Sequence, residues 1–337
     1  MDGTGRTDSS IQLGLGPGIC GTDVVDLCDP GVAHRCGPLR QDLPLDRVKA
    51  WLAYWGLRVG VGLVGLLPHS AAIWLGSFAG RVWYSVDSRR RRMARRHMER
   101  VLGSETDVAK ASESVMRSYG RYFAEALWVR APRIPGILEK TSVEGLDLVV
   151  AAKDEGNGMV FSVPHVGNWE VAAPVALKVG IPVVAVAEDL PNKRITNWFT
   201  SMRNDFGIEI VLATGRIEVM RQLEAAIADN KAVALLADRD LNGKGVEVEF
   251  FGENTTLPAG PAALAVKTGA PLFPVAVYFD GDGHRVVVRP AIEVPEGKRS
   301  DRVKKMTQSM ARELEYLILA APDQWHLVVP NWPSDKE

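Results

Sequence analysis

The sequence of 337 residues has only three cysteines, and all of them lie within the first 36 residues. Three cysteines cannot form a disulfide framework, so we expect a reducing compartment. An overall excess of charge is also missing, since 40 Lys and Arg face 41 Asp and Glu for a net charge of −1, which excludes a protein that is basic throughout. The sequence has no G-x-S-x-G motif, which disfavours a serine hydrolase. Its histidines are scattered singly, so we predict no metal site.

Hydrophobic residues make up 46% of the chain and charged residues 24%, as in ordinary globular proteins. Residues 1–44 differ from the rest, because they are rich in Gly, Asp, Ser and Pro and show no sustained apolar period. Such a segment cannot bury enough apolar surface to offset its chain entropy. We therefore predict that residues 1–44 form a disordered acidic tail.

Positive charge is concentrated directly after this tail. Residues 47–100 contain eleven Lys and Arg against Asp87 and Glu99, for a net charge of +9. Within them, residues 59–80 carry no charge, which is long enough to cross a bilayer, but Pro68 interrupts the stretch. Two helices, at about 45–66 and 70–86 with Ser70 as the second N-cap, fit better than one span. We predict that residues 45–102 form membrane-interface helices with an arginine-rich segment.

Amphipathic tryptophan rings and clustered arginines are the residue types that favour an anionic lipid surface. The predicted membrane contacts are Trp51, Trp55, Arg89, Arg90, Arg91 and Arg92. A solvated helix face or an RNA-binding arm would also accommodate the basic run. Because its neighbour is apolar and rich in tryptophan, we favour an anionic membrane surface as the partner and expect no nucleic acid.

After residue 140, short β-branched runs alternate with longer amphipathic ones, which predicts an α/β fold. Strands are expected at 158–163, 182–187, 208–212, 232–236, 246–251, 272–279 and 284–289. Helices are expected at 110–130, 144–153, 168–178, 192–206, 216–229, 260–268 and 298–321. The pattern indicates a mixed, mostly parallel sheet flanked by helices, with an antiparallel final hairpin, in one body at residues 103–333.

The strand predicted at 158–163 leads into the sequence VPHVGNWE. Functional groups of open α/β sheets gather at the carboxyl ends of strands, where this pattern places His165. A carboxylate five residues on, Glu170, can reach back to one imidazole nitrogen while the other accepts a proton. The alternative is an ordinary strand-end histidine and a solvent-facing glutamate favoured by the helix dipole.

HVGNWE resembles the H-x4-D/E signature of the lysophospholipid-acyltransferase-like superfamily, in the branch of the bacterial lipid A biosynthesis acyltransferases and the actinobacterial acyltransferases of phosphatidylinositol mannosides. Three further segments are similar to that branch, in the same order along the chain. They are SMRNDFGIEIV, the block from LLADRDLNGKGVEVEFFGE to APLFPV, and PDQWHLVVPNW. The resemblance covers about residues 45–333, and the DRDLNGKGVEVEFFGE wording looks more like the mannoside enzymes.

The resemblance implies that His165 is a general base for an acceptor hydroxyl and that Glu170 orients it. Arg203 would steady an oxyanion or a donor phosphate, and Asp238, or alternatively Asp240, would be a second active-site acid. Plain alternatives are a surface ion pair for Arg203 and turn-capping roles for the two aspartates. The remaining site candidates are Asn168 beside the substrate and, around the acyl chain, Trp198, Phe199, Phe250 and Phe251.

These inferences predict a peripheral acyltransferase on the cytoplasmic face of the inner membrane. It would move a long-chain acyl group from acyl-CoA to a mannose hydroxyl of phosphatidylinositol mannoside or a related glycolipid, without a cofactor. One alternative is a lipid A-type acyltransferase that uses acyl carrier protein. Another, of a different class, is a non-catalytic membrane- or RNA-binding protein.

Overall fold

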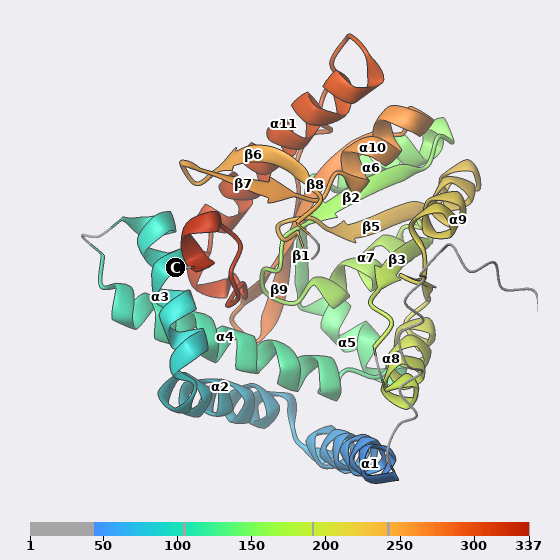
Figure 1. Cartoon of the computed structure of the whole chain (residues 1–337). Helices are drawn as coiled ribbons and strands as arrows, with labels where there is room; N and C mark the ends of the chain where they lie inside the picture. Colours follow the sequence, from blue (N-terminus) through green and yellow to red (C-terminus); the bar gives the residue numbers. More distant parts are fainter. Residues whose placement is uncertain (1–43, 104–105, 191, 241–242, 337) are drawn as a thin grey trace, which may run out of the picture.

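The computed structural model describes residues 44–103, 106–190, 192–240 and 243–336. The predicted tail at 1–44 therefore lies outside the described residues, except for its last position. The described chain forms an α/β structure with a central sheet and helices on both faces (Figure 1). The expected α/β class is confirmed.

The sheet has seven strands in the order β1-β9-β8-β2-β5-β3-β4. Strands β8, β2, β5, β3 and β4 run parallel to one another, and β1 runs parallel to β9. Strands β8 and β9 are antiparallel, so the expected mixed sheet with an antiparallel final hairpin is confirmed. The strands are β1 (Thr141–Glu144), β2 (Met159–Val163), β3 (Val183–Ala187), β4 (Ile208–Leu212), β5 (Ala232–Leu236), β8 (Leu272–Asp280) and β9 (Gly283–Val288). A separate hairpin pairs β6 (Val246–Phe250) with β7 (Glu253–Leu257).

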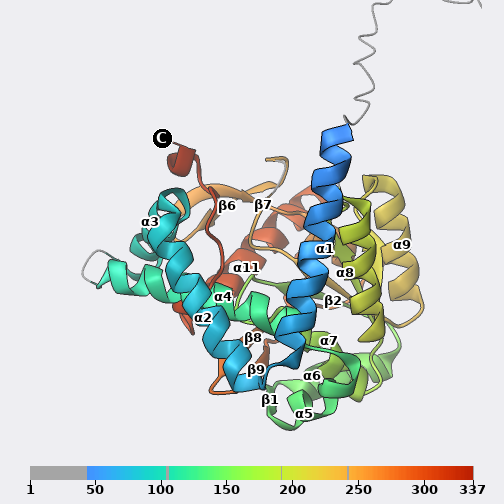
Figure 2. The same ribbon diagram turned by 90° about the horizontal axis from the view of Figure 1, so that it is seen from below.

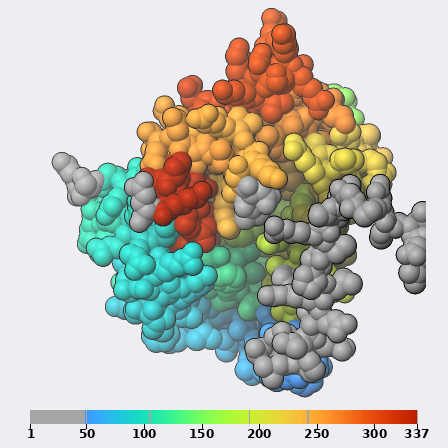
Figure 3. All heavy atoms as spheres, viewed as in Figure 1, coloured from blue at the N-terminus to red at the C-terminus, as the bar shows by residue number. Residues whose placement is uncertain are grey.

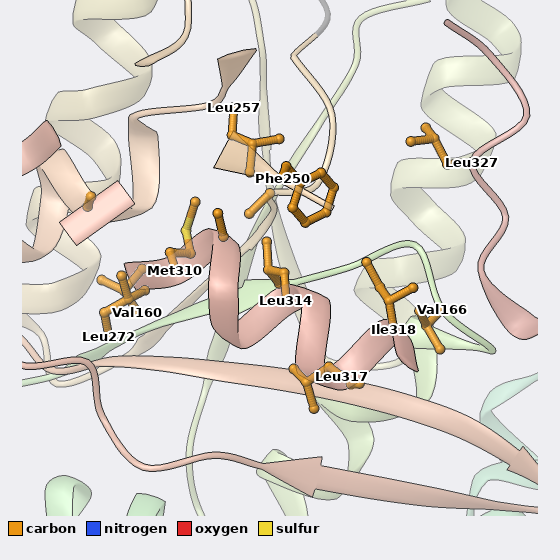
Figure 4. Close-up of a cluster of buried hydrophobic side chains, with 14 of the residues drawn as sticks. Val160, Val166, Phe250, Leu257, Leu272, Met310, Leu314, Leu317, Ile318 and Leu327 are labelled. Carbon is orange, nitrogen blue, oxygen red and sulfur yellow. The ribbon is translucent and has the colours of Figure 1, made fainter. Parts of the chain in front are cut away.

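Two buried clusters cover the two faces of the sheet. One face packs on α9 (Arg216–Ala228), α10 (Gly260–Thr268), α11 (Arg299–Leu319) and the β6–β7 hairpin. Figure 4 shows α11 contributing Met310, Leu314, Leu317 and Ile318 to this cluster. The other face packs on α5 (Ile134–Glu139), α6 (Leu146–Glu155), α7 (Ala172–Lys178) and α8 (Lys193–Asp205).

The N-terminal helices are α1 (Pro44–Leu66), α2 (His69–Val86), α3 (Ser88–Leu102) and α4 (Val108–Trp128). Pro68 separates α1 from α2 as expected, but the predicted cap is wrong, because α2 begins at His69 and Pro68 holds the N-cap position without a side-chain bond. No helix among the described residues is both long enough and apolar enough to cross a membrane. Figure 2 shows α1 beside α8, where Asn192 Nδ2 donates to the Ala50 carbonyl at 2.9 Å.

Close contact between α2 and α4 depends on glycine. A Cβ on Gly80 would lie 2.1 Å from the Met116 carbonyl oxygen, and one on Gly120 would lie 2.1 Å from the Gly76 carbonyl oxygen. Side chains at these positions would force the helices apart. The glycines therefore hold α2 against α4, which also carries residues of the site described next.

Candidate active site

His165 and Asp238 meet because the strands before them are paired in register. Strands β2 and β5 are parallel neighbours, with Val163 opposite Leu236. Two residues beyond this pair, the chain places His165 on one strand end and Asp238 on the other. The His165 Nδ1 atom lies 2.6 Å from Asp238 Oδ1, and the His165 backbone N–H donates to Oδ2 at 2.9 Å.

The Asp238 carboxylate is fully buried and accepts three hydrogen bonds. Its Oδ2 accepts a second bond from Trp325 Nε1 at 2.8 Å, and its backbone carbonyl accepts from Asn331 Nδ2 at 3.1 Å. Burial favours the neutral acid, but the charge and hydrogen bonds of His165, together with the indole N–H, outweigh it and lower the pKa of Asp238. An ionised Asp238 accepts the Nδ1 hydrogen of His165. The other imidazole nitrogen, Nε2, is then free to take a proton from a substrate.

His165 itself remains open to a substrate, since a quarter of its side chain, 25%, is exposed. The turn after His165 is held by Trp325 and His326. Val166 forms an isolated β-bridge with Trp325, and the His326 N–H donates to the His165 carbonyl at 2.8 Å. Gly167 is required here, since it has φ +56° and a Cβ would lie 2.0 Å from the Val277 carbonyl oxygen.

The structure contradicts the expectation that Glu170 orients His165. Glu170 lies in the 3-10 helix Trp169–Val171 and pairs with Arg203 of α8, which donates from Nε to its two oxygens at 3.2 and 3.0 Å and also from a terminal nitrogen. A separation of five residues across this turn directs the carboxylate away from the imidazole. Burial disfavours the Arg203 charge, but Glu170 outweighs burial and raises the pKa of Arg203. The guanidinium expected to hold an oxyanion or a phosphate is thus engaged by a carboxylate.

Two further candidates lie elsewhere. Asn168 has no exposed surface, and its Nδ2 donates at 3.0 Å to Glu125, so it braces the turn against α4. Asp240 accepts hydrogen bonds from Gly245 N at 2.6 Å and from Thr256 Oγ1 at 2.9 Å. These bonds match the alternative in which the aspartate caps a turn. Of the two aspartates, Asp238 is the one that contacts His165.

An apolar cavity of about 360 Å³ lies between the sheet and helices α4, α7 and α8. The Trp169 ring joins it to the His165–Asp238 pair, because it lines the cavity and meets the His165 ring edge-on at a centroid distance of 5.3 Å. The Glu170–Arg203 pair also forms part of the wall. Small and aliphatic side chains make up much of the rest, including Ala173, Ala176, Val186, Ile210 and Leu235.

Of the four aromatic residues predicted around an acyl chain, Phe199 lines this cavity. Trp198 packs edge-on against Phe199 but is not part of the wall. Phe250 is fully buried and stacks on Trp332, and Phe251 contacts Trp325, so both belong to the core under the chain's end. The prediction is wrong for Phe250 and Phe251, because the type of an aromatic residue does not show which side of the sheet it faces.

The proposed membrane residues divide into exposed and engaged side chains. Trp51 and Trp55 on α1 are 47% and 48% exposed, and Trp74 on α2 is 66% exposed. Arg89 and Arg92 are exposed as well. The other two predicted contacts, Arg90 and Arg91, are half-buried: Arg90 pairs with Asp87 at 2.5 Å, and Arg91 donates to the carbonyls of Tyr84 and Ser85 at 2.8 Å.

The chain is similar to a family of bacterial acyltransferases over most of its length. The family described as "Bacterial lipid A biosynthesis acyltransferase" matches residues 41–334. A protein of Mycolicibacterium smegmatis named phosphatidylinositol mannoside acyltransferase is 34% identical over 286 residues, covering 83% of this chain and 91% of that protein. A protein of the same name from Mycobacterium tuberculosis is 34% identical over 253 residues, covering 72% and 77%. The chain belongs to the bacterial lipid A biosynthesis acyltransferase family and is an acyltransferase.

Proposed function

We propose that this acyltransferase moves a long-chain, palmitoyl-like acyl group from acyl-CoA to a mannose hydroxyl of phosphatidylinositol mannoside or a related glycolipid. The acceptor class follows the name of the two mycobacterial relatives. The observation that carries the chemistry is the His165–Asp238 pair beside an apolar cavity. A thioester donor suits this site because it needs a base for the incoming hydroxyl and an apolar slot for the chain.

In the proposed reaction, His165 Nε2 takes the proton of the acceptor hydroxyl while the oxygen attacks the thioester carbonyl. Asp238 keeps the Nδ1 hydrogen in place and stabilises the imidazolium that forms. The C–O bond forms, the C–S bond breaks, and His165 returns the proton to the departing CoA thiolate. The acyl chain occupies the cavity, and Trp169 forms the wall between chain and base.

The test is CoA release from palmitoyl-CoA in the presence of mannoside lipid. His165→Ala and Asp238→Asn should each lower kcat by about 10²- to 10⁴-fold, the usual contribution of a general base and its orienting carboxylate. Asp282→Asn, which changes an exposed carboxylate in the β8–β9 turn, is the matched control and should retain full turnover. Undiminished turnover in folded His165→Ala would sink the mechanism. Turnover with palmitoyl acyl carrier protein, but none with palmitoyl-CoA, would show that the donor is acyl carrier protein and not CoA.

We also propose a peripheral position on the cytoplasmic face of the inner membrane, with α1 and α2 at the lipid surface. The support is the exposed apolar surface of these helices, which includes Trp51, Trp55, Trp74 and Phe78. Trp74→Ser should weaken flotation with anionic phosphatidylglycerol vesicles. Tyr316→Ser, a similarly exposed aromatic position on α11, should not. Equal binding of the Trp74→Ser variant and the parent protein would contradict the placement of α2.

A further inference from the structure

The last described residues of the chain form part of the surroundings of Asp238. Residues 325–335, here called the C-terminal segment, supply the Trp325 indole N–H to Asp238 Oδ2 at 2.8 Å and the Asn331 amide to the Asp238 carbonyl at 3.1 Å. Trp325 also forms an isolated β-bridge with Val166, in the turn after His165. The geometry of Asp238 therefore depends on where this segment lies.

Asp335 closes the segment into a tight turn. Its Oδ2 accepts from the backbone N–H groups of Asn331 at 2.9 Å and Trp332 at 3.1 Å, and its side chain has no exposed surface. These two bonds hold Asn331 in the position from which its side chain reaches Asp238. Trp332, also fully buried, stacks on Phe250 and anchors the turn in the core.

The anchor of this turn lies on α3. His97 is completely buried, with Nδ1 2.7 Å from the Leu327 carbonyl oxygen and Nε2 3.1 Å from Asp335 Oδ2. A carbonyl oxygen only accepts hydrogen bonds, and so does an ionised carboxylate. His97 therefore faces an acceptor at each ring nitrogen, and its ring links α3 to both Leu327 and Asp335.

Arg100, one turn along α3, strengthens the same contact. It donates from a terminal nitrogen to Asp335 Oδ1 at 3.3 Å and to Ser334 Oγ at 3.0 Å, and its guanidinium lies 4.0 Å from the Trp332 ring centre. Figure 3 shows the end of the chain, in red, packed between the blue-green N-terminal helices and the orange surface of the later elements. Helix α3 thus holds the C-terminal segment by charge and by stacking.

We propose that Asp335, held by His97, is a positioning residue for acyl transfer: it fixes the C-terminal segment so that Trp325 and Asn331 keep Asp238 oriented toward His165. The inference rests on the proposed role of His165 as the base. Asp238 Oδ2 is occupied by the His165 and Trp325 N–H groups, so Oδ1 alone faces Nδ1. When Trp325 withdraws, Asp238 Oδ2 loses one of its two donors, and the rotation of the carboxylate is less firmly set.

The experiment uses the full chain and the variants Asp335→Asn and Trp325→Phe. Trp325→Phe removes the N–H donor and keeps an aromatic ring. Both should lower kcat by roughly 10- to 100-fold, because a small misplacement of a catalytic group has an effect of that size. The KM for palmitoyl-CoA should stay within about twofold, since the cavity is lined by other residues.

A second measurement does not depend on turnover. The indole N–H resonance of Trp325, identified by its loss in Trp325→Phe, should move in Asp335→Asn toward the position of a water-exposed indole. The matched control is Leu223→Ala on α9, which destabilises the same core from a helix that packs mainly on α10, β5 and β4. It should leave both kcat and the Trp325 resonance unchanged at temperatures where every variant is folded.

The outcomes separate this inference from the proposed function. Wild-type kcat in folded Trp325→Phe, or an unmoved Trp325 resonance in folded Asp335→Asn, overturns the positioning role. If Asp335→Asn does not fold, kcat and KM of Trp325→Phe decide the question. Full turnover in His165→Ala would refute the base itself, while the Trp325 resonance would still report whether Asp335 holds the segment. A shift of the acid limb of kcat/KM to higher pH in Trp325→Phe supports the inference, because a less stabilised Asp238 raises the proton affinity of the pair.

Discussion

Removal of the Glu170 carboxylate should destabilise the fold through Arg203. The two side chains are only 10% and 22% exposed, and Arg203 donates to Glu170 from two nitrogens in the wall of an apolar cavity. In Glu170→Gln the guanidinium keeps its charge and its place but loses its counter-charge. Replacing Arg203 by Met in the same chain removes the stranded charge and adds apolar surface to the wall.

The magnitude follows from the burial of the pair. Breaking a buried ion pair by removing one partner costs about 3–5 kcal/mol. Because Arg203 keeps some contact with water and the substituted glutamine side chain retains one carbonyl oxygen, we expect a loss near 2–3 kcal/mol, below that range. In a protein of this size such a loss lowers the unfolding midpoint by roughly 5 °C. The double variant should regain most of it, since apolar replacements of buried pairs are often neutral.

Urea unfolding followed by circular dichroism, with both single variants and the double variant, measures the coupling between the two positions. Glu218→Gln is the control, because Glu218 forms a similar pair with Arg221 at 49% and 71% exposure and should not shift the midpoint. A Glu170→Gln protein that unfolds at the parental urea concentration would refute the reasoning. Lost turnover with unchanged stability would instead favour the role for Glu170 that the sequence suggested.

Three further changes test the packing, the buried charges and the cavity. Gly80→Ala should cost about 1–3 kcal/mol by thermal unfolding, because its Cβ would lie 2.1 Å from the Met116 carbonyl oxygen, whereas Gly62→Ala on α1 meets open space and should cost nothing. Burial lowers the pKa of His326 to about 3, so the unfolded chain alone takes up this proton, and stability should fall by up to about 1.4 kcal/mol per pH unit below about pH 6.5. In urea unfolding between pH 6.5 and 5, His326→Gln should show a smaller loss, and an identical slope would contradict the burial effect. Ala176→Phe should fill part of the cavity and lower kcat/KM for palmitoyl-CoA more than for octanoyl-CoA in CoA-release assays, and an unchanged ratio would place the acyl chain elsewhere.

The sequence predicted the strands and helices whose hydrophobic pattern is clear. Strand β2 reads MVFSV and is buried at every position, as expected for a strand between two parallel neighbours. It did not predict β1 (Thr141–Glu144) or β7 (Glu253–Leu257), which read TSVE and ENTTL. These strands contain few apolar residues and are held by pairing with β9 and β6, which no local pattern records.

The site shows the same limit at the level of single residues. His165 was predicted because a strand end and a turn are local features. Its carboxylate partner could not be chosen locally, since Asp238 lies 73 residues away and meets the imidazole only because β2 and β5 are neighbours in the sheet. Trp325 is a further 87 residues from Asp238. Separation along the chain favours the nearby Glu170, although its turn directs it to Arg203.

The arginine-rich helix α3 shows why charge counted along a sequence overstates what a surface offers. Four of its seven arginines are engaged within the protein, where Arg90 and Arg91 bind the end of α2 and Arg96 and Arg100 bind the C-terminal segment. The remaining three, Arg89, Arg92 and Arg95, are exposed. Since each exposed cation adds only about 1 kcal/mol at an anionic surface, the proposed lipid attachment must rely largely on the apolar faces of α1 and α2. The same helix contributes His97 to the turn that contacts Asp238, so a chain of contacts through Asp335 and Asn331 connects α3 to the proposed catalytic pair.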